Sequence, residues 1–76
     1  MVANRATWGV KELDTGLIVA RGSVPTADEA IREAAHYAIQ YGQDGPVCYW
    51  VKQDGKILVQ GSLNGVTIVA TPDDAN

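Results

Sequence analysis

The sequence has a single cysteine, Cys48, which excludes a disulfide within the chain and the disulfide scaffold of a small secreted domain. Six Lys and Arg stand against nine Asp and Glu, for a net charge of −3, and this argues against a protein that binds nucleic acid by neutralising its phosphates. No apolar run approaches the length of a membrane span, and residues 1–5 do not lead into the apolar core of a signal peptide. We therefore expect a cytoplasmic protein that does not contact a membrane.

The residues that could do chemistry are few and badly spaced for it. Only His36, Cys48 and carboxylates could bind a metal, and no pair has the spacing of a zinc motif. The pattern predicts Cys48 on a buried sheet face and His36 on a solvated helix face, so the two cannot form a nucleophile–base pair. We predict no catalytic, cofactor-binding or metal-binding residue, and hence no enzyme.

The 76 residues are enough for one domain only, and residues 1–6 and 72–76 are predicted to be flexible tails. Glycine-containing turns, Asp14-Thr15-Gly16, Asp54-Gly55 and Asn64-Gly65, separate runs of strand-forming residues. The predicted strands are Thr7–Leu13, Leu17–Val24, Val47–Gln53, Lys56–Ser62 and Val66–Thr71. The fold class is α+β in the order ββαβββ, a single antiparallel sheet with one helix packed on one face.

The helix is predicted from Thr26 to about Tyr41. Thr26 and Glu29 have the spacing of a capping box, and Gly42 suits the position just past the helix. One face carries the apolar residues Ala27, Ala30, Ile31, Ala34, Ala38 and Tyr41. Three alanines on that face would let the helix lie close to the sheet.

The tight turns also predict which residues face the helix. A three-residue first loop places Trp8, Val10, Ile18 and Ala20 on the core side. In the second half, a two-residue turn makes Trp50 oppose Val59 and Cys48 oppose Gly61, on the face that the helix covers. The opposite face would then carry the residues Tyr49, Val51, Leu58, Gln60, Thr67, Val69 and Thr71.

Since one helix covers one side of a sheet, this second face would be left in water, and an exposed apolar patch often marks an interaction site. We therefore predict a protein interface at Tyr49, Val51, Leu58, Gln60, Thr67 and Val69. The alternative is that such residues occupy a solvated face because they suit strands.

A second candidate interface is acidic. Asp28, Glu29 and Glu33 lie on the solvated side of the predicted helix, where they could meet a basic protein surface or serve only as helix-capping charges. The positive charges are scattered, although Lys11 and Arg21 should share the sheet face opposite Trp8.

The run from Trp8 to Val19, the alanine-spaced helix from Asp28 to Gly42 and the hairpin after it resemble some small phage-encoded anti-CRISPR proteins. The resemblance spans about residues 7 to 60. It implies a hairpin–helix–hairpin plan, a bacterial or infected-cell cytoplasm, and inhibition of a CRISPR–Cas complex by binding it. It transfers no functional residue, and the Asn64-Gly65 turn departs from the pattern.

Three hypotheses follow. The first is a non-catalytic protein-binding inhibitor, encoded by a phage or mobile element, that acts on a host defence complex such as CRISPR–Cas. The second is a homodimeric structural or regulatory module that pairs through its open sheet face. The third is a weak single-stranded nucleic-acid binder that uses Tyr49 and nearby basic residues.

Overall fold

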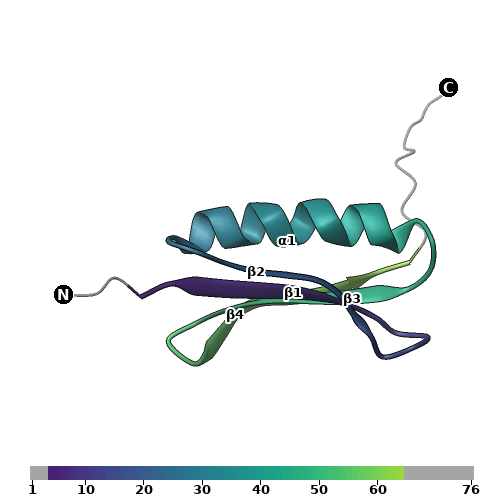
Figure 1. Ribbon diagram of the computed structural model, residues 1–76, viewed down its shortest axis with the longest axis horizontal. Coiled ribbons are helices and arrows are strands. Elements are labelled where there is room, and N and C mark those ends of the chain that lie inside the picture. The colour runs from purple at the N-terminus through teal and green to yellow at the C-terminus, as the bar shows by residue number, and fades with distance from the viewer. Residues whose placement is uncertain (1–3, 65–76) are drawn as a thin grey trace, which may run out of the picture.

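The computed structural model describes residues 4–64, and these form two layers, a sheet and a helix that lies over one face of it and runs along the strands (Figure 1). The elements are β1 (Ala6–Glu12), β2 (Ile18–Val24), α1 (Ala27–Gly42), β3 (Val47–Gln53) and β4 (Lys56–Leu63). All neighbouring strands are antiparallel, in the order β2-β1-β3-β4. The predicted α+β class, with one antiparallel sheet and one helix on one face, is confirmed. The predicted strand Val66–Thr71 lies outside the described residues.

The helix begins as its sequence predicts. The backbone N–H of Glu29 donates to the side-chain oxygen of Thr26 at 3.2 Å, and the Thr26 hydroxyl donates to the Glu29 carboxylate. This arrangement satisfies one of the backbone donors that a helix start leaves without a partner. The negative charges of Asp28 and Glu29 in the first turn also stabilise the helix, because they lie near the positive end of its dipole.

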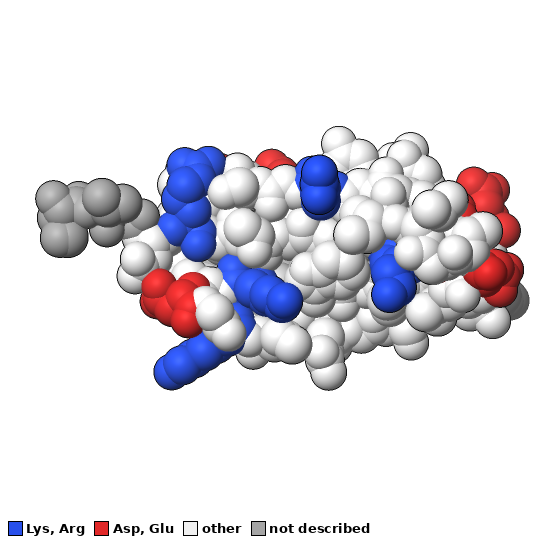
Figure 2. Space-filling model, turned by 60° about the horizontal axis from the view of Figure 1, so that its bottom comes forward, with Lys and Arg blue, Asp and Glu red and all other residues white. Residues whose placement is uncertain are grey.

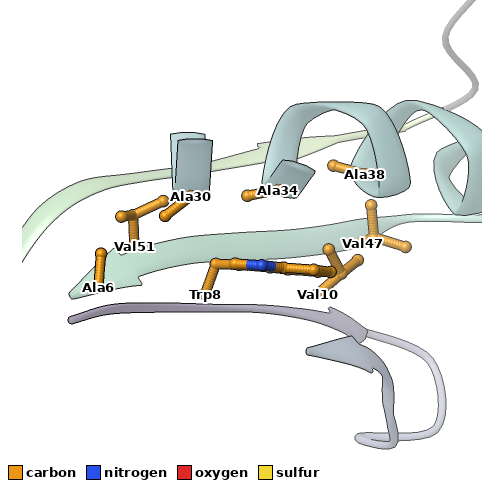
Figure 3. Close-up of a cluster of buried hydrophobic side chains, with 8 residues drawn as sticks. All are labelled: Ala6, Trp8, Val10, Ala30, Ala34, Ala38, Val47 and Val51. Atoms are coloured by element: carbon orange, nitrogen blue, oxygen red, sulfur yellow. The ribbon is translucent and has the colours of Figure 1, made fainter. Parts of the chain in front are cut away.

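The core is small and lies between α1 and the two central strands (Figure 3). Its buried members are Ala6, Trp8, Val10, Ala30, Ala34, Ala38, Val47 and Val51. The three alanines point from α1 toward β1 and β3, so the helix backbone can approach the sheet closely. Ala6, predicted in the N-terminal tail, is instead wholly buried at the start of β1.

The first hairpin departs from its predicted register at one residue. Val10 pairs with Ala20 and Lys11 pairs with Ile18, so Val19 is an extra residue in β2. Such a bulge exchanges the faces of the residues beyond it. Ile18 therefore lies on the face away from the helix, half exposed, and its predicted core position is wrong.

A second bulge changes the second hairpin more seriously. Asp54 and Gly55, with φ of 57° and 76°, form the predicted two-residue turn, and Lys52 pairs with Ile57. Val51 then pairs with Val59, which leaves Leu58 as the extra residue. The predicted pairs of Trp50 with Val59 and of Cys48 with Gly61 are therefore wrong, because the prediction assumed an unbroken ladder.

Each junction between neighbouring strands has an aromatic residue directly opposite a glycine. Trp8 opposes Gly22 across β1 and β2, Trp50 opposes Gly9 across β3 and β1, and Tyr49 opposes Gly61 across β3 and β4. A methyl group on any of the three glycines would collide with the aromatic ring opposite. Each ring therefore occupies the space that a side chain at the glycine would take, and it covers the glycine backbone that would otherwise be exposed.

Candidate functional site

The sheet face turned away from α1 has nothing packed on it among the described residues. Strand pairing arranges it in three rows that run across β2, β1, β3 and β4. We call these twelve residues the open face: Ser23, Thr7, Lys52 and Ile57; Arg21, Gly9, Trp50 and Gln60; Ile18, Lys11, Cys48 and Ser62.

The charge of the open face is opposite to that of the whole protein. Lys11, Arg21 and Lys52 belong to it, one on each of three strands and one in each row. Arg5 adjoins it, because its guanidinium donates to the Ser23 side chain at 2.9 Å and to the Ser23 carbonyl at 2.8 Å. Four of the six Lys and Arg thus gather here, although the net charge is −3.

Within residues 4–64 the acidic residues lie off this face. Figure 2 shows Lys and Arg spread over it and Asp and Glu at its ends and rim. Within residues 4–64 no Asp or Glu occupies an outward strand position on this side, since Glu12 pairs with the buried Val47 and the others lie in turns, loops or α1. Together with the adjoining Arg5, the open face therefore carries a positive charge of about four units at neutral pH.

Trp50 lies at the centre of this positive charge, flat on the sheet. A Cβ atom built on Gly9 would be 2.7 Å from both Cε2 and Cη2 of Trp50, and closer still to the atom between them. The two ring atoms bonded to the nearest atom are thus almost as close to this Cβ position as the nearest atom itself. If the Cβ approached the edge of the ring, those two atoms would be much farther away. The Cβ position therefore lies over the face of the ring. One π-face of Trp50 covers Gly9, and the other faces outward.

The flat indole separates two shallow hollows. One, of about 480 Å³, extends toward Arg21 and is lined also by Thr7, Ser23 and Ile18. The other, of about 360 Å³, lies on the β4 side and is lined by Cys48, Gln60 and Ser62. The side chains around Trp50 are thus mainly hydroxyls, an amide and cations, which donate hydrogen bonds.

The predicted sheet interface is only partly on this face. Gln60 belongs to the open face as predicted, and the bulged Leu58 is 46% exposed. Tyr49 and Val51 lie on the helix side, Val51 completely buried, so their predicted placement on the open face is wrong. Thr67 and Val69 lie outside the described residues. The open face is consequently polar and basic, not the apolar patch that the sequence predicted.

The acidic helix residues have structural partners. Glu29 takes part in the helix cap, and Glu33 accepts a hydrogen bond from the indole N–H of Trp8 at 3.0 Å. Asp28 is exposed in the first turn. Capping and support of Trp8 therefore account for two of the three carboxylates predicted as an interface.

A groove of about 900 Å³ runs between α1 and β2, and Trp8 and Tyr37 are among the residues that line it. Their rings stack with centroids 5.2 Å apart, and His36 meets Tyr37 edge-on at 5.0 Å.

His36 is exposed on the helix, whereas Cys48 is half-buried on the open face. The predicted burial of Cys48 is therefore wrong, but His36 and Cys48 lie on opposite sides of the sheet and so remain apart, as predicted. Within residues 4–64 no three His, Cys, Asp or Glu form a group that could hold a metal ion.

Comparison of the chain with protein-family models, curated proteins and solved structures found no match. No helix among the described residues is long and apolar enough to cross a membrane.

The central residue of the site, Trp50, was assigned to the core by sequence reasoning. A usable signal is present in β3. Val47, Tyr49 and Val51 are all apolar, whereas the alternate positions, to which Trp50 belongs, include Lys52. A lysine in phase with Trp50 indicates the solvated side of a strand. The other signal is that Lys11 and Arg21 share one face of the sheet, which the sequence did predict.

Proposed function

We propose that this domain is a non-catalytic binding module and that its open face engages an anionic macromolecule. The observation that carries the proposal is the segregation of charge, because an acidic protein has four of its six cations around one outward-facing aromatic ring. Charge of one sign on a surface raises the rate of encounter with a partner of opposite sign and disfavours partners of like sign.

The acidic layer does not cancel this attraction. The carboxylates of α1 lie on the far side of the sheet, in a layer that is itself about 10 Å thick, the diameter of a helix. At physiological ionic strength the Debye length is about 8 Å, so a ligand on the open face experiences mostly the nearby cations. The net charge of −3 is therefore a poor guide to the partner of this face.

The homodimer hypothesis gains no support from this charge. Two open faces placed together would bring Lys11, Arg21 and Lys52 of one copy against the same cations of the other. Like charges brought together without counterions disfavour association. Inhibition of a host defence complex such as CRISPR–Cas, which the resemblance implies, is kept as a proposal for the biological setting, with the open face as the contact surface.

The test is binding to fluorescently labelled heparin, a polyanion without bases, followed by fluorescence anisotropy at low and moderate salt. We expect measurable binding that weakens steeply as salt rises. Arg21→Gln should weaken binding several-fold, whereas Arg32→Gln, the same charge change on α1, should leave it unchanged. Absence of binding, or equal loss in both variants, would contradict the proposal.

A further inference from the structure

We infer that the anionic partner is a single-stranded nucleic acid, one base of which stacks on the outward π-face of Trp50. This inference rests on the proposed function and specifies its partner. Flat aromatic rings that lie on a sheet between cations bind single strands, because every base has a π-face and every linkage carries a phosphate. Trp50 is such a flat ring, because Gly9 beneath it has no side chain and leaves room for the indole to lie parallel to the sheet.

The surroundings of Trp50 match the other parts of a nucleotide. Arg21 lies in the same row, two strand positions away, which is about 10 Å from backbone to backbone. A guanidinium can bridge that separation and bind a phosphate in a bidentate manner. Thr7 and Ser23 line the hollow on the same side, and Gln60 and Ser62 line the other, so hydroxyl and amide groups flank the ring where the edges of a base would lie.

The size of the face favours a nucleic acid over an acidic protein. Four strands and three rows cover roughly 400 Å² at ordinary strand spacing and rise. A stable protein interface buries about 800 Å² on each partner and has an apolar centre. A few nucleotides need much less area, and a basic, polar surface with one exposed ring suits them.

A double helix would not use this surface in the same way. Its bases are stacked on one another, so their faces are accessible only at the ends of the duplex. Trp50 lies on a flat sheet and does not project, so it is not shaped to wedge between paired bases. The inference is therefore restricted to single strands.

The decisive experiment compares two labelled oligonucleotides about 12 nucleotides long, one of thymidines and one abasic, which carry the same phosphates. We expect the thymidine strand to bind about 5- to 150-fold more tightly, the contribution of one stacked base. It should also quench tryptophan fluorescence, whereas the abasic strand should not. With one phosphate neutralised by each of Lys11, Arg21 and Lys52, the plot of log affinity against log salt should have a slope of about −2.

Three variants at two positions assign the effect. Trp50→Ala should bring thymidine binding down to the abasic level, and Trp50→Tyr should keep most of the difference, because tyrosine can still stack. Arg21→Gln should weaken binding to both strands alike. Circular dichroism checks that each variant is folded, and if Trp50→Ala is not, Trp50→Tyr and the fluorescence of the unmodified protein decide the matter.

The outcomes separate the two proposals. Equal binding of thymidine and abasic strands, together with binding to heparin, would overturn the stacking inference and leave the anionic partner in place. Binding to heparin but to neither oligonucleotide would point to an acidic protein or polysaccharide and would also overturn the inference. Failure of heparin and both strands to bind would overturn both proposals.

Discussion

A methyl group added at Gly22 should destabilise the protein far more than the same group added at Gly9. A Cβ on Gly22 would lie 2.6 Å from Nε1 and 2.9 Å from Cε2 of Trp8. Trp8 cannot move aside, because it is 4% exposed, stacked on Tyr37 and hydrogen-bonded to Glu33. The collision would have to be relieved by the helix or by β2.

The expected magnitude follows from two opposing effects. Alanine is favoured over glycine within a strand by about 0.5–1 kcal/mol, because glycine loses more backbone freedom on folding. Overpacking a core costs about 1–3 kcal/mol, and losing the bond between Trp8 and Glu33 adds about 1 kcal/mol. Gly22→Ala should therefore lower the free energy of unfolding by about 1–3.5 kcal/mol, and the melting temperature by about 5–25 °C.

Gly9→Ala is the matched control. A Cβ there would collide with Trp50, but within the described residues nothing covers that ring, so it can lift into the solvent. Its net effect should stay within about 1 kcal/mol, because the gain from alanine partly offsets the lost contact. Thermal unfolding followed by circular dichroism measures both variants. In a Trp8→Leu background, Gly22→Ala should be nearly neutral, because the indole with which the added methyl group collides is then absent.

The reasoning fails if Gly22→Ala melts within a few degrees of the unmodified protein. It also fails if Gly9→Ala falls equally far, because the two tryptophans would then be equally confined. The first result would mean that Trp8 is not held between β2 and α1 as described, and the second that Trp50 cannot lift away from the sheet.

Three further predictions test other parts of the fold. Trp8→Ala should cost about 3–5 kcal/mol and Trp50→Ala roughly 1–2 kcal/mol in chemical denaturation, and the reverse order would mean that the faces of β3 are exchanged. Glu33→Ala should cost about 1 kcal/mol, because the indole N–H loses its acceptor, and Glu33→Gln should recover part of it. Deletion of Leu58 should change the free energy of unfolding by less than about 1 kcal/mol, since it removes the bulge and keeps every other pair between β3 and β4. Loss of the NMR amide signals of β3 in the deletion variant would contradict this.

Local signals predicted most of the fold correctly. Thr26 and Glu29 marked the helix start, and Asp54-Gly55 marked a two-residue turn whose backbone angles are as expected. Alanine spacing identified the buried side of α1, where Ala30, Ala34 and Ala38 lie. These features depend on a few adjacent residues, so no knowledge of distant contacts was needed.

The site was missed because faces are decided over longer distances. One extra residue, Leu58, exchanges the faces of everything after it in β4, and no turn signal announces it. With β3 and β4 aligned by the turn alone, Trp50 was placed in the core and Val51 in solvent. The burial of Val51 against α1 and the exposure of Lys52 favour the opposite arrangement, and the bulge accommodates it.

The aromatic–glycine pairs connect the fold to the proposed site. The pair of Trp8 with Gly22 lies on the covered face, and the pair of Trp50 with Gly9 lies on the open face, with β1 contributing to both. A shift of β1 by one residue would therefore remove the support of both rings at once, burying charge on one side and exposing apolar surface on the other. The register that the core requires is thus also the register that holds Trp50 flat among the cations. Selection for a stable core would maintain the proposed binding surface, and a residue larger than glycine at Gly9 would disturb this surface more than the core.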